Sequence, residues 1–461
     1  MSFISVAFLI FLPLVFLLYW ALQRHLRCQN IALLTASYVF YAWWDWRFLF
    51  LILITSASSF TSGLIMPKTS HKRWVLTACV LLNLGILGVF KYYGFFIDNL
   101  QAMLAPLGIA LDAPTLHLIL PVGISFYTFQ SLSYAIDVYR GTLTPTRRIV
   151  DFFAYIAFFP QLVAGPIERA TNLLPQISSP RTFRYDEAVE GLRRILWGFF
   201  KKMVVADNCA LAVNTIWADY AGADAMTLVA GMLLFTFQIY GDFSGYSDIA
   251  IGTARLFGIR LMENFRLPYF SATMPEFWRR WHISLMTWFR DYLYIPLGGS
   301  REGNVRTIRN ILIVFLLSGL WHGANWTFVV WGLYNACLLL LWRVVRLRSI
   351  LLTFLLAAVG WVVFRSASMT EAVDYFSTLV SQLSTLHLGS IAHGKQALLW
   401  CLLLVVIEWL QRRKDHPLQL DVLPVWVRWT AYYALILLTV FARGEEQTFI
   451  ISSFSSVFLP Y

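Results

Sequence analysis

Charged residues are scarce in this chain. Only 13% of its 461 residues are Asp, Glu, Lys or Arg, whereas a soluble domain carries about 25%. Hydrophobic residues make up 59% of the chain, and the mean hydropathy is +0.64. This composition excludes an ordinary soluble protein and predicts a chain that is embedded in a membrane at many points.

Acidic residues are fewer than basic ones, which leaves a net charge of +11. A basic chain can bind nucleic acid, but here the basic residues lie in short clusters between apolar runs. That distribution is typical of the cytoplasmic loops of membrane proteins. We therefore expect no nucleic-acid partner.

Cysteine is also rare, and the N-terminus lacks the features of a signal peptide. The five cysteines show no metal-type or redox spacing, so we expect no metal site and interpret them as small apolar side chains: Cys28, Cys79, Cys209, Cys337 and Cys401. The segment 1–20 has no basic start, and no small-residue cleavage site follows before Arg24. It is interpreted as the first membrane helix.

Long apolar runs are what the chain does contain. A helix needs about 20 apolar residues to cross the hydrocarbon core. Candidate spans lie at roughly 3–20, 31–43 paired with 46–66, 74–97, 116–139, 188–217 (broken), 227–258, 311–342, 349–365, 396–411 and 425–443. They predict an all-α polytopic membrane protein with about ten to twelve membrane-embedded helices, some of them re-entrant or kinked. No repeat or soluble segment is visible, so residues 1–461 are expected to form one membrane domain.

The loops predict an orientation. Basic clusters occur at 24–27, 68–73, 140–148, 169–202, 299–309, 343–348 and 412–414, whereas 98–115, 218–226 and 366–395 carry few basic residues. The basic clusters are expected in the cytoplasm. The run Ile311–Trp342 contains no Asp, Glu, Lys or Arg and lies between two basic clusters. It is too short for two full crossings, which need about 40 residues. The chain is expected to enter the membrane, break near Gly319–Gly323, and return, which places His322 beside a cavity.

A second histidine lies in the segment 273–296. Thr273 and Glu276 form a capping-box pattern. The segment is predicted to be one amphipathic helix with a polar stripe and His282 on the opposite, apolar face. The stripe consists of Glu276, Arg280, Ser284, Thr287 and Asp291.

Two buried histidines suit a particular chemistry. Burial lowers the pKa of an imidazole and keeps it able to accept a proton, as a general base that activates a hydroxyl or thiol requires. The plainer interpretation is that each histidine is satisfied by hydrogen bonds inside the protein. Ionisable groups at membrane depth nevertheless favour function, and two of them favour a shared site. No GxSxG elbow or nucleophile-like cysteine is present, so a covalent acyl-enzyme is not indicated.

Several motifs together resemble the membrane-bound O-acyltransferase superfamily, in the branch of alginate O-acetyltransferase and D-alanyl-lipoteichoic-acid transferase proteins. They are EFWRRWHISLMTWFRDYLYIPLGG (276–299), SGLWHGANWTFVVWGLYN (318–335), LPVGISFYTFQSLSYAIDVYRG (120–141), FFPQLVAGPIER (158–169), QIYGDFSGYSDIAIGTARLFGI (238–259), ASYVFYAWW (36–44) and LGVFKYYGFF (87–96). The core motifs lie at about 120–345, followed by C-terminal helices within 349–443.

The resemblance implies a helical fold around a central tunnel in which a cytoplasmic acyl donor meets an extracytoplasmic acceptor. It implies that His322 is the essential histidine and His282 its companion. It also matches structural or pocket-lining positions, which we take as candidate substrate-binding residues: Trp321, Gly323, Arg280, Asp291 and Gln161. Asp242, Ser244 and Asp248 belong to a further matching motif. For these three residues, pinning a kinked helix is at least as good an interpretation as catalysis.

By this resemblance, the expected function is O-acetylation of an exported or cell-wall polysaccharide or peptidoglycan, from a cytoplasmic donor expected to be acetyl-CoA, with no bound cofactor. A separate extracytoplasmic acetyltransferase is an expected partner, and the expected location is the bacterial cytoplasmic membrane. An alternative of the same class is D-alanyl transfer from a carrier protein to teichoic acid. A proton-coupled transporter and a scaffold for an export machine are alternatives of other classes.

Overall fold

The computed structural model describes residues 1–109, 120–163, 165–385, 394–414, 416, 418–447 and 449–450. Throughout these residues the chain forms helices joined by loops, and no strand occurs in them. The all-α prediction is confirmed. The chain packs as two compact units. Unit 1 takes the described residues of Met1–Val189 and Thr253–Met262, and unit 2 takes those of Glu190–Gly252 and Glu263–Val457. The expectation of a single membrane domain stays a prediction.

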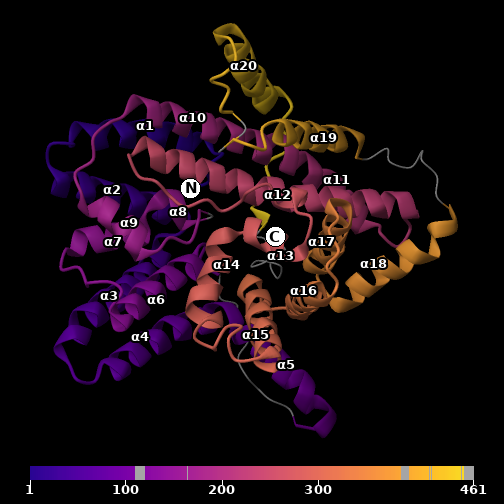
Figure 1. Cartoon of the computed structure of the whole chain (residues 1–461), viewed down its shortest axis with the longest axis horizontal. Coiled ribbons are helices and arrows are strands. Elements are labelled where there is room, and N and C mark those ends of the chain that lie inside the picture. Colours follow the sequence, from indigo (N-terminus) through magenta and orange to yellow (C-terminus); the bar gives the residue numbers. More distant parts are fainter. Residues whose placement is uncertain are drawn as a thin grey trace. The chain divides into compact units, whose positions relative to one another are not determined.

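Unit 1 contains the N-terminal helices. They are α1 (Val6–Ala21), α2 (Leu26–Ala42), α3 (Leu49–Ile65), α4 (Lys72–Leu87), α5 (Tyr93–Leu104), α6 (Ile124–Arg140), α7 (Ile149–Ala157), α8 (Phe159–Leu162) and α9 (Ala170–Ser178). Helices α3, α4 and α6 pack against one another, and α2 packs on α7 (Figure 1). Buried polar side chains join these elements. The Asn30 amide donates to Asp151 (2.8 Å), and the Arg181 guanidinium donates to Gln29 (3.0 Å).

Unit 2 contains most of α10 (Tyr185–Phe199), the π-helical turn η5 (Phe200–Ala206), α11 (Asp207–Ala218) and most of α12 (Ala225–Leu256). It continues with α13 (Met274–Arg280), α14 (Ile283–Phe289), α15 (Asn304–His322), α16 (Trp326–Val344), α17 (Ile350–Arg365), α18 (Met369–Ser381), α19 (Lys395–Leu410) and α20 (Val425–Phe441). Helix α18 lies in the stretch 366–395 that the sequence treats as a loop. Its N-cap, Ser368, accepts a hydrogen bond from the Glu371 backbone N–H (3.1 Å).

Four helical segments within the described residues are long and apolar enough to cross a membrane: Trp46–Lys68, Lys72–Leu107, Ala225–Leu256 and Trp326–Val344. Shorter apolar helices cover Val6–Ala21, Ile149–Leu162, Ile350–Arg365 and Val425–Phe441. They coincide with most of the apolar runs seen in the sequence. Residues 116–119 of the predicted span 116–139 lie outside the described residues. The chain is thus a multi-pass integral membrane protein.

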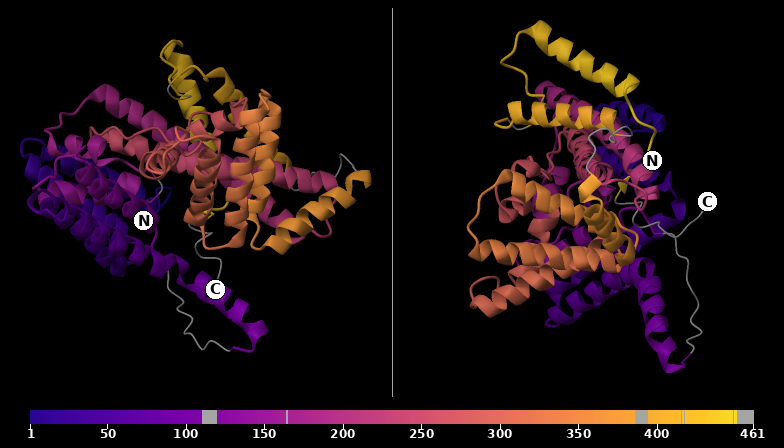
Figure 2. Two further views of the ribbon diagram at one scale, coloured as in Figure 1. Left: turned by 60° about the horizontal axis from the view of Figure 1, so that its bottom comes forward. Right: turned by 90° about the vertical axis from the view of Figure 1, so that its right-hand side faces the viewer.

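The helices α15 and α16 pack along each other (Figures 1 and 2). Gly319 lies at their closest approach, because a Cβ atom built there would fall 2.2 Å from the carbonyl oxygen of Phe328. Only a residue without a side chain lets the two backbones come this close. The packing of this pair holds the end of α15, where His322 lies, against the start of α16.

Candidate active site

His322 is the last residue of α15, at the break between two helices. The backbone is extended at Gly323 (φ −168°), and Asn325 caps the next helix by accepting a hydrogen bond from the Thr327 N–H (3.1 Å). The predicted break is therefore present. Helix α15 begins within the basic cluster 299–309, so the two arms on either side of the break, α15 and α16, have 19 residues each. Helix α16 is long enough to cross a membrane. How deeply the two arms lie in a membrane stays a prediction.

Aromatic side chains enclose the His322 ring. Trp331 and Phe364 lie edge-on to it with ring centroids 5.2 Å away in each case, and Trp321 lies at 5.0 Å. Only 9% of His322 is exposed. An imidazole in such surroundings is held by ring packing in a medium of low polarity.

His282 occupies a backbone conformation that the sequence did not predict. Its dihedral angles are φ 45° and ψ 52°, in the left-handed region. The chain therefore breaks at Trp281–His282 into α13 and α14, followed by a π-helical turn, η7 (Arg290–Tyr294). The prediction of one amphipathic helix over 273–296, with one polar stripe, is wrong. Its start is right, because Thr273 accepts a hydrogen bond from the Glu276 N–H (3.2 Å).

Asn264 explains the break at His282. Its backbone carbonyl accepts a hydrogen bond from the Ile283 N–H (2.9 Å), which fixes the left-handed turn. Its side-chain oxygen accepts from the Ser284 hydroxyl (2.9 Å), and its NH₂ group donates to Ser247 (3.1 Å). Asn264 lies on a loop far from residue 282 in the chain, and no local pattern in the sequence pointed to it.

The same amide fixes the tautomer of His282. The Asn264 Oδ1 atom is an acceptor, and it lies 3.1 Å from Nδ1 of His282. Nδ1 therefore carries the proton, and Nε2 keeps a lone pair. Nε2 is buried, and no hydrogen-bond partner for it occurs among the described residues. The histidine thus presents a basic nitrogen whose orientation is set by a neighbouring side chain.

Trp321 lies between the two histidines. Its indole is 5.8 Å from the His282 ring and 5.0 Å from the His322 ring, measured between centroids. The predicted proximity of the two residues is therefore seen. His282 lies outside the candidate membrane spans; burial lowers its pKa well below the usual range, and His322 lowers it further. The ring of Phe243 covers His282 edge-on at 4.6 Å.

The other predicted site residues have partners or positions of their own. Arg280 pairs with Glu276 (2.7 Å), and Asp291 pairs with Arg290 (2.7 Å) in η7. Gly323 is tightly packed, since a Cβ atom there would fall 2.2 Å from the Phe328 ring. Gln161 belongs to unit 1, where its amide donates to the carbonyl of Tyr155 (3.0 Å). Their substrate-binding roles stay predictions.

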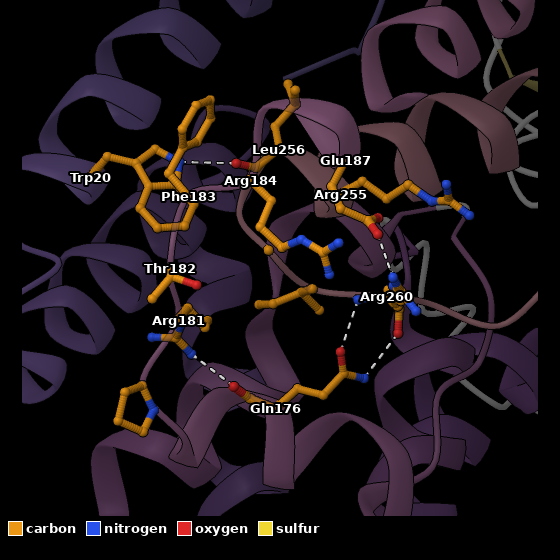
Figure 3. A pocket seen from close by; sticks show the side chains of 13 residues that line it. Trp20, Gln176, Arg181, Thr182, Phe183, Arg184, Glu187, Arg255, Leu256 and Arg260 are labelled. Carbon is orange, nitrogen blue, oxygen red and sulfur yellow. Dashed lines mark hydrogen bonds and ion pairs between the residues drawn. The ribbon is translucent and has the colours of Figure 1, made fainter. Parts of the chain in front are cut away.

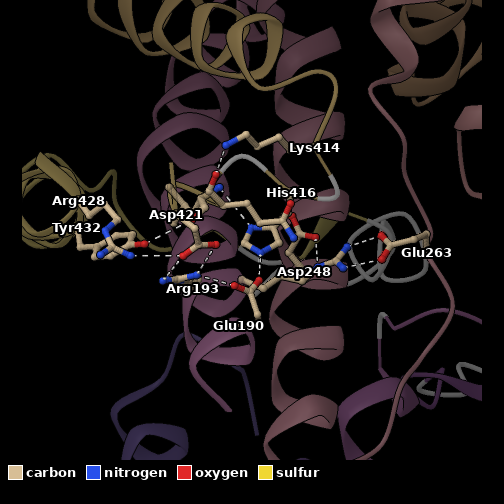
Figure 4. Close-up of polar contacts among 12 residues, drawn as sticks. Glu190, Arg193, Asp248, Glu263, Lys414, His416, Asp421, Arg428 and Tyr432 are labelled. Atoms are coloured by element: carbon tan, nitrogen blue, oxygen red, sulfur yellow. Dashed lines mark hydrogen bonds and ion pairs between the residues drawn. The ribbon is translucent and has the colours of Figure 1, made fainter. Parts of the chain in front are cut away.

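A buried ion-pair network surrounds the motif residues of α12. Lys202 pairs with Asp242 (2.8 Å) and Asp207 (2.7 Å). Asp248 pairs with Arg194 (2.9 Å) and Lys201 (2.5 Å), and Lys201 also donates to Ser244 (2.9 Å). Figure 4 includes Asp248 and Glu263, both of which pair with Arg194. These contacts fit the interpretation that Asp242, Ser244 and Asp248 pin a membrane helix.

The basic partners of this network were visible in the sequence but not recognised. Lys201 and Lys202 stand in the apolar candidate span 188–217, where unpaired charges are costly. That position was the available signal. In the part of the chain that the structure describes, no group of three or more His, Cys, Asp or Glu residues is placed to hold a metal ion.

Comparisons with known proteins show which proteins this chain is similar to. Residues 145–355 match the family model described as MBOAT, membrane-bound O-acyltransferase family. The chain is 44% identical over 398 residues to a probable alginate O-acetylase of Azotobacter vinelandii. This alignment covers 83% of this chain and 78% of that protein. It is 31% identical to a peptidoglycan O-acetyltransferase of Helicobacter pylori over an alignment of 520 positions, gaps included. That alignment covers 98% of this chain and 95% of the relative. It is 30% identical over 239 residues to a teichoic acid D-alanyltransferase of Bacillus subtilis, and this alignment covers 49% of this chain and 60% of the relative.

Proposed function

The chain belongs to the membrane-bound O-acyltransferase family, and we propose that it transfers an acetyl group from cytoplasmic acetyl-CoA to hydroxyl groups of an exported or cell-wall polysaccharide. The alginate and peptidoglycan relatives support the acetyl group and the polysaccharide, because each aligns with most of this chain. The D-alanyltransferase aligns with only 49% of it. D-alanyl transfer from a carrier protein is therefore the second candidate.

The observation that carries the proposal is the placement of two buried imidazoles on either side of Trp321. An acyl transfer to a hydroxyl needs a base that is neutral at the working pH and shielded from water. His282 presents Nε2 in that form, with its tautomer held by Asn264. The proton-relay transporter and the export scaffold gain no support, since the family is one of acyltransferases.

In the proposed reaction, His322 removes the proton of the acceptor hydroxyl or positions that hydroxyl. The oxygen of the hydroxyl attacks the thioester carbonyl carbon of the donor. A C–O bond forms, the C–S bond breaks, and the thiol of the donor leaves with the proton that the imidazole received. His282 orients the site and shares the proton. Such a positioned base contributes about 10²–10⁴-fold in rate.

The proposal also assigns roles to the residues around the histidines and places the enzyme in a membrane with a partner. Trp321 and Gly323 shape the wall beside His322, while Arg280, Asp291 and Gln161 contact substrate or line its path. The enzyme works in the bacterial cytoplasmic membrane with a separate extracytoplasmic acetyltransferase that completes the transfer. The basic clusters at 169–202 and 299–309 support a donor that arrives from the cytoplasm.

Labelled donors test this proposal. Inverted membrane vesicles that contain the full-length protein are given acetyl-CoA labelled in the acetyl group. We expect base-labile label on the polysaccharide or on the partner protein. A parallel sample receives D-alanine on a carrier protein. If label is transferred only from the carrier protein, D-alanyl transfer takes the place of acetylation as the function. If label is transferred from neither donor, both candidates are contradicted.

A further inference from the structure

Unit 1 contains a pocket that the proposed reaction does not use (Figure 3). Its volume is about 340 Å³, within the range of small-molecule sites. It is formed where the end of α1, the segment after α9, the start of α10 and the end of α12 meet. Its wall consists of Trp20, Gln176, Pro180, Arg181, Thr182, Phe183, Arg184, Glu187, Arg255, Leu256, Gly258, Ile259 and Arg260.

Two arginines of this wall have no partner for their guanidinium groups among the described residues. They are Arg184 and Arg255. An exposed arginine such as Arg184 is often unpaired, but Arg255 is only partly exposed, and its Nε atom is buried without a hydrogen bond. A buried charged donor left unsatisfied is unfavourable. In Figure 3, the Arg184 side chain extends toward the middle of the pocket.

The remaining charges of the wall do not neutralise these two. Arg260 pairs with Glu187, the single acidic residue of the wall. Arg181 donates to uncharged groups, including the carbonyl of Ile177 (2.8 Å). Four arginines and one glutamate leave a net formal charge of +3 on the wall. The pocket is therefore electropositive and suited to an anion.

Parts of the wall are joined by hydrogen bonds, and part of it is aromatic. The indole N–H of Trp20 donates to the Leu256 carbonyl (3.0 Å), and the Phe183 ring lies edge-on to Trp20 at 5.5 Å. The Gln176 amide accepts from the Arg260 N–H and donates to its carbonyl, both at 2.9 Å. These contacts tie three separate segments together. Trp20 and Phe183 line the same pocket as Arg184 and Arg255, and they offer rings against which the uncharged part of a ligand can pack.

We propose that this pocket binds a phosphate-bearing ligand, with Arg184 and Arg255 on the phosphate and Trp20 and Phe183 against its apolar portion. A planar guanidinium donates two parallel hydrogen bonds to phosphate oxygens. The ligand is either a soluble phosphorylated nucleoside or the headgroup of an anionic phospholipid. Seven residues of the wall lie within the basic cluster 169–202, and Trp20 lies just before the cluster 24–27; both clusters are predicted to be cytoplasmic. The inference stands on these residues and does not require the proposed acetyl transfer.

Binding measurements on the full-length protein test it. In nanodiscs of zwitterionic phosphatidylcholine, adenosine 3′,5′-bisphosphate is titrated by calorimetry. In discs that also contain phosphatidylglycerol, native mass spectrometry counts the phosphatidylglycerol molecules that stay bound. The variants are the double change Arg184→Gln with Arg255→Gln, the single change Glu187→Gln, and Arg147→Gln, an exposed arginine of the same unit outside the pocket.

We expect one of the two probes to bind, and the probe that binds identifies the source of the phosphate. The double change should weaken binding about tenfold or more, which is 1.4 kcal/mol or more. Glu187→Gln should tighten binding, because it removes the negative partner of Arg260, and Arg147→Gln should have no effect. Tightening cannot result from a damaged fold. Binding of neither probe, or equal losses in the double variant and in Arg147→Gln, would overturn the proposal.

Discussion

Two buried polar regions of unit 2 differ in how their charges and hydrogen bonds are satisfied. In the network of α10, η5 and α12, each basic side chain pairs with at least one carboxylate: Lys202 has two, and Arg194 has two. Around the histidines, aromatic rings pack against the imidazoles, and the side-chain amide of Asn264 orients His282. Among the described residues, the buried carboxylates of the first region have cationic partners, whereas Nε2 of His282 in the second region has no hydrogen-bond partner.

The difference separates stability from reactivity. Removing one member of a buried ion pair leaves an uncompensated charge and weakens the fold. Removing a histidine that lies among rings leaves no charge behind. The network should therefore respond to mutation mainly through stability, and the histidine region mainly through rate. Variants in the two regions test this difference, and the variant with the largest expected effect lies in the network.

Lys202→Met should destabilise the protein most. It leaves Asp242 and Asp207 buried without their cation, at an expected loss of about 3–5 kcal/mol. Thermal unfolding of the purified protein in detergent measures the effect. Lys68→Met, at an exposed lysine, is the control and should leave the melting temperature unchanged. Equal melting temperatures for the two variants would remove the structural role assigned to the network.

Gly319→Ala should disturb the pair α15 and α16 and with it the position of His322. The added methyl group meets the Phe328 carbonyl, and overpacking of this kind costs about 1–3 kcal/mol. We expect a lower melting temperature together with slower acyl transfer. Gly85→Ala is a matched control on another helix, because nothing lies within 4 Å of its Cβ position. A Gly319→Ala protein as active as the control would show that the close approach does not position the histidine.

Asn264→Ala should slow acyl transfer about 10–100-fold, the loss that removal of an orienting partner causes at metal-binding histidines. Asn264→Asp should restore much of the rate, since a carboxylate also accepts from Nδ1. It should also move the acidic limb of the pH–rate profile to higher pH, because the nearby negative charge raises the pKa of His282. An unshifted profile in Asn264→Asp would count against the assignment of His282 to the proton path.

The pH dependence of stability should show the smallest effect. Burial lowers the pKa of His282 in the folded state, so at low pH the unfolded chain binds a proton that the folded chain does not. The contribution of neutral His282 to the free energy of unfolding is full above the ordinary histidine pKa of about 6.5, and it is lost as the pH falls below that value. His282→Gln should lose this acid sensitivity. Melting curves from pH 7.5 to pH 5 check it; parallel curves for both proteins would contradict it.

The sequence predicted those features that depend on local pattern. The apolar runs located most helices, the glycines around His322 indicated the break, and Thr273 with Glu276 marked a helix start. The left-handed turn at His282 was missed because a positive φ is uncommon for histidine and is imposed here by Asn264, a residue distant in sequence. The ion pairs of Lys201 and Lys202 were missed for a related reason: their partners come together only in the fold.

The most direct test of this account is to measure surface acetylation and melting temperature together in His322→Ala. His71→Ala, at an exposed histidine, is the control. We expect His322→Ala to insert in the membrane, to melt near the control temperature, and to leave no base-labile acetate on the surface polysaccharide. Acetate at the control level, in a protein that has lost His322, would contradict the central claim that the histidine region carries the reaction.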